Sequence, residues 1–366
     1  MSGKYIVHGS DCSYYTGKIE AYLRAKDIDY HLEPFTVRGM RRCARATGVM
    51  QIPQIERPDG SWLVDTTPTI AYLETIHPDP PITPRDPVVR FIALLLEDYA
   101  DEWLWRPAMH YRWSFRETAR LMSGRLAEHL RGIPVPMVLK KRHWYRRQLG
   151  TFVKRDGVNA TTRAAVEASY HDTLDALDAI FAERPFVLGA RPTEADFGFF
   201  ASMFRHFFCD PTPARIMREK APGVHEWVAR MWSLKPVAFE LAPMPEELPT
   251  RLEPLLGAVS SIYLPYLAAN AAAHAQGKKD VEYDVQGVSW SEPVKPYRVW
   301  CLGELHPELM ALSEDDRAIV AAALDHADAL AILENEPAST ASSGLAELPI
   351  AAGSRTKPVD SWWRGR

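Results

Sequence analysis

Residues 49–74, VMQIPQIERPDGSWLVDTTPTIAYLE, decide the fold because they hold a strand, a turn, a second strand and a helix start in succession. Apolar and polar residues alternate from Gln51 to Glu56, and Pro58-Asp59-Gly60 has the composition of a tight turn. Trp62 to Val64 forms a second short apolar run. The stretch therefore predicts a β-hairpin.

The same stretch predicts a helix after the hairpin and an unusual bond within it. Thr66 and Thr67 precede Pro68, as expected of a hydroxyl cap followed by a proline in the first turn. Pro53 has no amide hydrogen to donate to a ladder, so it requires an edge, a bulge or a cis bond. At an edge, it would leave the backbone groups of Ile52 free for a ligand.

Composition limits the class of protein to which this hairpin belongs. A chain of 366 residues can build two cores and an extension, and 46% hydrophobic with 25% charged residues is ordinary for a globular protein. The net charge of -4 gives no overall attraction to nucleic acid or to an anionic membrane, so neither partner is expected.

The cysteines and the apolar runs predict the cellular compartment of the protein. Its four cysteines form no CxxC pair and show no metal-ligand spacing, which suits a reducing compartment and a site without metal. No apolar leader opens the sequence, and no run of about 18 apolar residues is present. We expect a soluble, cytoplasmic protein.

The first 80 residues read as β-α-β-α-β-β-α. A strand from Lys4 to His8 leads to a helix from Tyr14, and Asp29 to Phe35 forms a second strand before a short helix from Met40 to Thr47. This order, with Pro53 at the start of the third strand, resembles the thioredoxin-like domain of cytosolic glutathione transferases.

The resemblance implies a glutathione site along the opening stretch. In this family the bond before the proline is cis and the adjacent backbone pairs with the cysteinyl part of glutathione, which implies that Gln51, Ile52 and Pro53 line the co-substrate. An acidic residue followed by Ser or Thr holds the γ-glutamyl end, here Asp65 and Thr66. Free N–H groups at a helix start suit a carboxylate. Alone, these two would be a turn residue and a helix cap.

The resemblance places the catalytic position in the loop before the first helix. Ser13 lies where family members activate the glutathione thiol, and a hydroxyl beside a helix N-terminus can donate to the sulfur of a thiolate. Ser13 could equally be a plain N-cap. Cys12 would instead support a mixed disulfide with glutathione, and Tyr14 and Tyr15 offer two further hydroxyls.

Basic residues follow the second strand. The family approaches the glycyl carboxylate of glutathione from this region, so one arginine could bind it, although a solvated helix face explains most of them. Which one binds is left open among Arg38, Arg41, Arg42 and Arg45.

A proline-rich linker at 81–87 separates a domain at 1–80 from a helical domain at 88–243. Apolar residues at helical spacing from Val88 to Trp105 predict its first helix. The resemblance implies that this region walls the cleft for the electrophile, with Tyr14, Tyr99, Trp103 and Trp113 as candidate pocket residues. Such aromatic stripes are otherwise part of a core.

Residues 185–197, PFVLGARPTEADF, carry the second family signal. Thr193 and Asp196 have the spacing of a capping box, and the helix that follows, to about Cys209, is apolar on nearly all sides. The same F-x-x-G-x-x-x-(T/S)-x-x-D pattern opens the core helix of the all-α domain in glutathione transferases. We interpret it as a folding determinant.

The remaining segments are less informative about function. Helical spacing from Arg251 to Ala275 and from Ser313 to Leu330, with a strand or hairpin between Val281 and Trp290, predicts a helical extension at 244–333. The composition of 334–366 predicts an extended or partly disordered tail, which Trp362 and Trp363 could anchor. The basic segment Leu121 to Gly157 is interpreted as a solvated helix face.

Together these features predict an α+β thioredoxin-like domain followed by an all-α helical bundle with additional C-terminal helices. The resemblance implies a homodimeric glutathione transferase that activates the thiol of its co-substrate for attack on a small hydrophobic electrophile. Two alternatives remain open: a Cys-dependent thiol transferase or lyase, and a non-catalytic binding or scaffold protein on the same fold.

Overall fold

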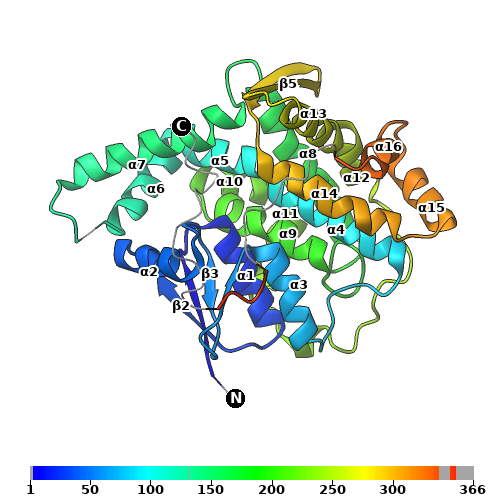
Figure 1. The fold of residues 1–366 in the computed structure, drawn as a ribbon, viewed down its shortest axis with the longest axis horizontal. Coiled ribbons are helices and arrows are strands. Elements are labelled where there is room, and N and C mark those ends of the chain that lie inside the picture. The colour runs from blue at the N-terminus through cyan, green and yellow to red at the C-terminus, as the bar shows by residue number, and fades with distance from the viewer. Residues whose placement is uncertain (1–2, 131, 338–346, 352–366) are drawn as a thin grey trace.

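The computed structural model describes residues 3–130, 132–337 and 347–351 (Figure 1). Its N-terminal part follows the predicted order, with the sheet ordered β2-β1-β3-β4 and only β1 and β2 parallel. The elements are β1 (Tyr5–Gly9), α1 (Tyr14–Ala25), β2 (Tyr30–Pro34), α2 (Val37–Thr47), β3 (Gln54–Glu56), β4 (Trp62–Val64) and α3 (Thr66–Ile76). The predicted hairpin is therefore β3 and β4.

The opening stretch differs from its prediction at the start of α3. The helix begins at Thr66 rather than Pro68, and its N-cap residue is Asp65, whose side chain makes no capping hydrogen bond. The expected hydroxyl cap is therefore wrong, because both threonines lie inside the first turn. The peptide bond between Ile52 and Pro53 is cis, one of the three solutions that the sequence left open for this proline.

Helices make up the rest of the described chain up to residue 238. They are α4 (Pro87–Glu102), α5 (Trp105–Trp113), α6 (Arg116–Glu128), α7 (Met137–Phe152), η1 (Lys154–Asp156), α8 (Arg163–Phe181), α9 (Glu194–Ser202), η2 (Met203–Phe208), α10 (Pro211–Lys220), α11 (Pro222–Trp232) and η3 (Pro236–Ala238). Helix α4 packs along α9, and α1 packs against the same α9, so α9 lies at the centre of the molecule.

The central position of α9 follows from its sequence. The predicted capping box is present: the Asp196 carboxylate accepts from the Thr193 amide at 3.0 Å and the Thr193 side chain accepts in return. Every residue of α9 is buried. A side chain at Gly198 would place its Cβ 2.8 Å from the Cα of Glu97, so glycine allows α9 and α4 to approach closely.

The extension builds further helices and a hairpin onto this bundle. Its elements are α12 (Glu253–Ala258), η4 (Val259–Tyr263), α13 (Leu264–Ala275), β5 (Asp280–Val285), β6 (Val288–Pro293), α14 (Pro296–Met310), α15 (Glu314–Leu324) and α16 (Ala329–Glu334). Both α14 and α15 pack against α4, and β6 packs against η1, which directly follows α7. Figure 1 shows α15 and α16 at the end of the molecule opposite α6 and α7.

One continuous helix in the extension, Glu253–Ala275, is long and apolar enough to cross a membrane by length and composition. However, 56% of its apolar window is buried inside the protein, with side chains such as Leu256, Tyr263 and Leu267 fully or almost fully covered. That burial is typical of a core helix.

Part of the predicted tail is ordered against the N-terminal sheet. Ile350 forms an antiparallel bridge with Trp62 at the outer edge of β4, through two backbone hydrogen bonds of 2.8 Å. These two side chains, Cys43 and Val64 make a small separate core. Trp362 and Trp363 lie outside the described residues, so their predicted anchoring role stays a prediction.

Candidate active site

One cleft of about 1300 Å³ brings together the predicted glutathione-binding residues, the loop before α1 and the extension. Of the predicted catalytic, glutathione-binding and pocket residues, all but Tyr99 and Trp103 line this cleft, and all of those that do except Trp113 lie on its N-terminal wall. That wall includes Ser10, Cys12, Ser13, Tyr14, Gln51, Ile52, Pro53, Asp65 and Thr66.

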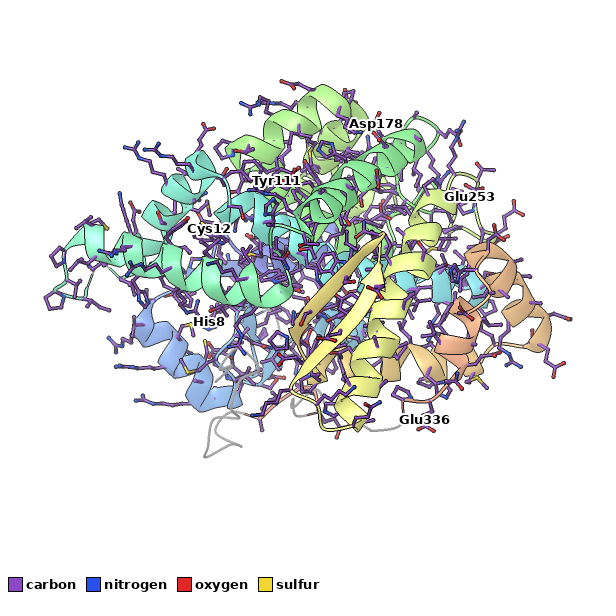
Figure 2. The ribbon with its side chains drawn as sticks, turned by 90° about the horizontal axis from the view of Figure 1, so that it is seen from above. His8, Cys12, Tyr111, Asp178, Glu253 and Glu336 are labelled. Carbon is purple, nitrogen blue, oxygen red and sulfur yellow. The ribbon has the colours of Figure 1, made fainter. Side chains whose placement is uncertain are left out.

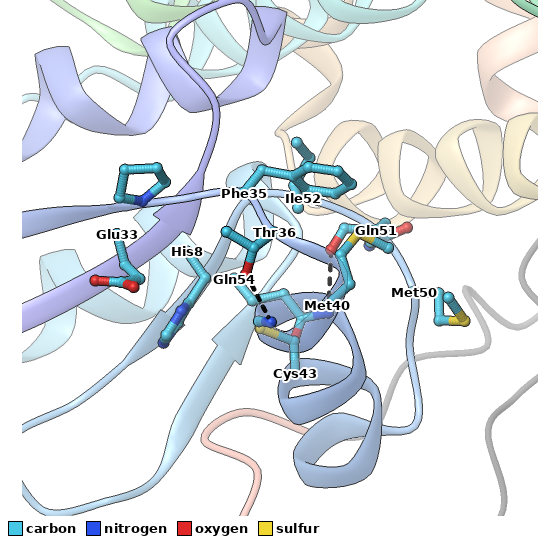
Figure 3. Close-up of a pocket in the computed structure, with 12 residues that line it drawn as sticks. His8, Glu33, Phe35, Thr36, Met40, Cys43, Met50, Gln51, Ile52 and Gln54 are labelled. Atoms are coloured by element: carbon cyan, nitrogen blue, oxygen red, sulfur yellow. Dashed lines mark hydrogen bonds between the residues drawn. The ribbon is translucent and has the colours of Figure 1, made fainter. Parts of the chain in front are cut away.

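The loop before the cis-proline is held by a buried glutamine. The Gln54 side-chain amide donates to the carbonyl of Val49 at 2.8 Å and of Gln51 at 3.1 Å, and its oxygen accepts from Thr47 at 3.0 Å. A small pocket of about 10 Å³ lies beside it, between this loop, β2 and α2 (Figure 3). These bonds fix the backbone of Gln51 and Ile52 at the edge of the cleft.

Asp65 occupies a strained position at the start of α3. Its φ of 67° lies in the left-handed region, which a non-glycine residue rarely adopts, and such outliers cluster at ligand sites. Its carboxylate accepts a 2.7 Å hydrogen bond from the Tyr297 hydroxyl of the extension. Burial raises the pKa of Asp65, whereas the Tyr297 bond and the Lys18 charge oppose this rise.

Lys18 supplies that charge from a fully buried position on α1. Its ammonium group pairs with Glu97 and with Asp101 of α4, and donates to the Thr67 hydroxyl at 3.1 Å. Burial alone would lower the pKa of Lys18, but the two carboxylates outweigh it and raise the pKa above its usual value. A permanent cation therefore lies behind Asp65.

Ser13 is the N-cap of α1, with its oxygen accepting from the Thr16 amide at 3.3 Å. Ser13 is therefore a helix cap, as one of its two interpretations predicted. The capping bond uses a lone pair of the hydroxyl oxygen and leaves the hydroxyl hydrogen available. Because Ser13 lines the cleft at the positive end of the helix, the hydroxyl hydrogen can be donated to a bound anion.

The neighbouring thiol is in a different environment. Cys12 is only 4% exposed, and its sulfur donates to the Asp11 carboxylate at 3.4 Å. Burial, with the Asp11 charge, raises the pKa of Cys12 to about 11. A thiol in this environment is protonated at neutral pH, whereas reactive cysteines have a lowered pKa.

Sequence reasoning missed Arg112, which positions this loop. Its guanidinium donates to the Cys12 carbonyl at 2.6 Å and to the buried Asp210 carboxylate at 2.6 Å. His129 acts similarly: its Nδ1 donates to the Phe35 carbonyl at 2.9 Å, and its Nε2 lies 3.4 Å from the Ser10 hydroxyl. Both residues are on helices far along the chain, and no local motif marks them.

Neither tyrosine of the loop offers a free hydroxyl. The Tyr14 hydroxyl donates to the Ala100 carbonyl at 2.5 Å, and that of Tyr15 to the Asp101 carbonyl at 3.0 Å. Burial, together with the Asp101 charge, raises the pKa of both phenols well above the usual value. Both residues nevertheless line the cleft.

The aromatic wall differs from the sequence prediction. Trp113 lines the cleft as expected, but Tyr99 and Trp103 do not. Trp103 packs against Tyr266 of α13 and Trp290 of β6, so the extension covers the side chain that was predicted to line a pocket. Other side chains take these places: Trp105, Met109, Trp144, Phe152 and His206.

His206 sits among these aromatic rings, with centroids 5.5 Å from Tyr14 and 6.1 Å from Trp105. Burial, assisted by the Arg112 charge, lowers the pKa of His206 well below its usual value. The neutral imidazole is therefore favoured at physiological pH.

The extension forms the remaining wall. Lys295 joins it to the helical domain by pairing with Asp156, and within the extension it pairs with Glu292 at 2.8 Å; the Arg298 guanidinium lies against the Glu102 carboxylate. Among the Lys, Arg, Asp and Glu side chains that line the cleft, the basic ones outnumber the acidic ones. The basic ones are Arg112, Arg147, Arg155, Lys278, Lys279, Lys295 and Arg298, and the acidic ones are Asp65, Asp101, Glu102, Asp156 and Asp280.

Two further features are the arginines of α2, proposed to bind the glycyl carboxylate of glutathione, and the side chains that could bind a metal ion. None of the four α2 arginines lines the cleft, and Arg42 instead pairs with Glu56 at 2.6 Å. Over the described ranges, no group of three or more His, Cys, Asp or Glu side chains is arranged to hold a metal ion.

Two family models match the chain. The glutathione S-transferase N-terminal domain matches residues 7–81, and the glutathione S-transferase C-terminal domain matches residues 160–230. No curated protein matches this sequence.

The chain is also similar to several solved structures that are distant from it in sequence. A glutathione S-transferase from Rhodospirillum rubrum F11 is 18% identical over 68% of this chain and 97% of its own, with a TM-score of 0.41. The beta-etherase LigF from Sphingobium sp. strain SYK-6 is 17% identical over 63% and 95%, with a TM-score of 0.44. A Methylobacterium radiotolerans glutathione S-transferase, in complex with glutathione sulfonate, is 17% identical over 68% and 97%, with a TM-score of 0.40.

Proposed function

The chain carries the N-terminal and C-terminal domains of the glutathione S-transferase family, and from this premise we propose that it is a cytoplasmic glutathione transferase. The observation that carries the proposal is the meeting, in one cleft, of the cis-proline loop, Asp65 at the start of α3 and Ser13 at the start of α1. The Ile52 backbone would pair with the cysteinyl part of glutathione, and Asp65 would bind its γ-glutamyl ammonium.

Ser13 would act on the sulfur. Its hydroxyl hydrogen and the positive end of α1 stabilise a thiolate, whose charge they face. The thiol proton leaves to solvent, and the sulfur forms a bond to an electrophilic carbon, from which the leaving group departs with its electron pair. A free thiol has a pKa of about 8.5, so even a modest lowering of that pKa increases the reactive fraction at neutral pH.

The second substrate would bind against the aromatic wall. Trp105, Trp113 and Phe152 favour an aromatic or aliphatic electrophile, and the surplus of basic side chains in the cleft favours one with an acidic group. The homodimer implied by the resemblance is a separate proposal, which sedimentation velocity tests directly.

The first prediction concerns Ser13. Isothermal titration should show glutathione binding at millimolar concentration, and Ser13→Ala should raise the pKa of the bound thiol by about one to two pH units with little change in affinity, because a hydrogen bond to a charged group is lost. The readout is thiolate absorbance against pH. Ser13→Thr, which keeps a hydroxyl, should titrate close to the wild type. An unchanged titration in Ser13→Ala removes the residue from this role.

The same measurements separate the alternatives. If Cys12→Ser abolishes turnover and Ser13→Ala does not, thiol-transfer chemistry replaces the proposal. The raised pKa of Cys12 weighs against that result. If no glutathione binds, the fold serves as a binding or scaffold protein.

A further inference from the structure

Helices α6 and α7 leave the body of the protein as an antiparallel arm, seen from two directions in Figures 1 and 2. The tip of this arm, residues 132–139 (GIPVPMVL), is exposed throughout. Five apolar side chains there face solvent: Ile133 is 38% exposed, Val135 42%, Met137 40%, Val138 70% and Leu139 50%. Contiguous exposed apolar patches mark protein or membrane contacts.

The charge around the tip is of one sign. No Asp or Glu occurs from residue 129 to residue 155, although the chain as a whole has a net charge of -4. The basic residues of this segment are Arg131, Lys140, Lys141, Arg142, Arg146, Arg147, Lys154 and Arg155. Lys140 folds back to donate to the Leu130 carbonyl at 2.6 Å, which ties the tip to its base.

Helix geometry divides α7 into two faces. Val138, Lys141, Arg142 and Tyr145 follow the i, i+3, i+4, i+7 spacing and are all exposed. The opposite face, with His143, Trp144, Arg147, Gln148 and Thr151, lines the cleft. The outward face therefore carries apolar side chains at the tip and cations immediately behind them, without a role in the cleft.

We propose that the outward face of the arm docks on the surface of an anionic lipid bilayer. The tip would insert Val138, Leu139 and their apolar neighbours at the boundary between headgroups and acyl chains, and Lys141, Arg142 and Arg146 would bind lipid phosphates. Amphipathic elements with these two components bind membranes peripherally, with a strength set by buried apolar area and anionic charge.

The observations favour a bilayer over other acidic partners. Nucleic acid would use the cations but offers nothing to the apolar tip, and the tip is the convex end of a projecting arm rather than a groove for a peptide. The net charge of the whole chain gave no reason to expect a membrane partner, but the charge of this segment is positive. The docking surface does not depend on glutathione binding. Because the other face of α7 lines the cleft, docking would bring an apolar electrophile in the bilayer near the site.

Vesicle co-sedimentation of the full chain tests this proposal. The protein should sediment with vesicles of phosphatidylcholine and phosphatidylglycerol at low salt, and should sediment far less with pure phosphatidylcholine or at high salt. The double variant V138D/L139D should reduce the bound fraction by about tenfold or more, and K141E/R142E should do the same.

A matched control comes from exposed apolar residues elsewhere. Val237 and Leu241 are 81% and 94% exposed on a different surface, so V237D/L241D should bind vesicles like the wild type. Thermal unfolding should show that all variants remain folded, because every substituted side chain is exposed. Absence of binding at low salt, equal binding to neutral vesicles, or equal loss in the control variant each overturns the proposal. Tip substitutions that dissociate a dimer without affecting vesicle binding would assign the tip to a protein interface instead.

Discussion

The proposed co-substrate site depends on the ionisation state of Asp65, and the surroundings of this residue control that state. It must be ionised to bind an ammonium group, yet burial raises its pKa. Three interactions oppose that rise: the hydrogen bond from the Tyr297 hydroxyl on α14, the Lys18 charge on α1 and a hydrogen bond from the Thr67 backbone.

Tyr297→Phe should therefore make glutathione binding more sensitive to acid. Without the 2.7 Å hydrogen bond the pKa of Asp65 rises further, so the neutral carboxylic acid persists to a higher pH. Affinity, measured by calorimetry across pH, should fall at a higher pH than in the wild type, with a loss of about tenfold at the acidic end. Tyr145→Phe, on the exposed side of α7, serves as the control. Parallel pH profiles for both proteins would contradict this role of Tyr297.

At the scale of single residues, the sequence indicated the site residues that belong to short motifs. It gave no sign of contacts between residues that are far apart in the chain. Ile52-Pro53 and Ser13 stand in short motifs whose chemistry is contained in a few adjacent residues. Tyr297 meets Asp65 across 232 positions, and Arg112 meets the Cys12 carbonyl across 100. Neither pair leaves a spacing in the sequence that identifies it, since only the packing of α5 and α14 brings them to the cleft.

At the scale of elements, the start of α9 concentrates several backbone contacts on one carboxylate. Asp196 accepts from the amides of Val187 at 2.9 Å and Thr193 at 3.0 Å, and from the Trp227 indole at 3.3 Å. It thereby joins the loop before α9 to α11. Burial raises the pKa of Asp196 to about 6, and these three donors keep the rise moderate.

Asp196→Ala should destabilise the protein by roughly 2–4 kcal/mol, because three buried donors lose their acceptor at once. Urea unfolding followed by circular dichroism gives this difference. Thr193→Ser retains the capping hydroxyl and should cost less than about 1 kcal/mol. If Asp196→Ala had only a small effect on the free energy of unfolding, water would be accepting the three hydrogen bonds in place of the carboxylate.

The capping box and the aromatic stripe of α4 show what periodicity can and cannot predict. The box was predictable because both partners lie within one turn. The stripe correctly indicated that Tyr99 and Trp103 are turned inward, but not what covers them. Tyr263 packs on Tyr99, and Trp290 on Trp103, so the extension covers both side chains.

At the scale of the whole molecule, the C-terminal end of the described chain meets the edge of the N-terminal sheet. Strand β4 would expose its outer backbone groups there, and unpaired edges invite further strand pairing. The bridge to Ile350 satisfies Trp62, and the Ile350 side chain, 2% exposed, closes the small core around Cys43. Composition alone predicted only an extended tail, since nothing in 347–351 specifies which edge it pairs with.

Two truncations isolate this contact. A chain ending at residue 351 keeps the paired segment, whereas one ending at residue 346 removes it together with the acceptor of the Trp62 amide. Hydrogen exchange of the Trp62 amide should accelerate by at least about tenfold in the shorter chain and stay near the full-length rate in the longer one, because a single edge contact opens locally without global unfolding. Equal exchange in both truncations would mean that the bridge does not protect β4 in solution. Faster exchange of the Trp62 amide in both truncations would mean that its protection depends on residues beyond 351.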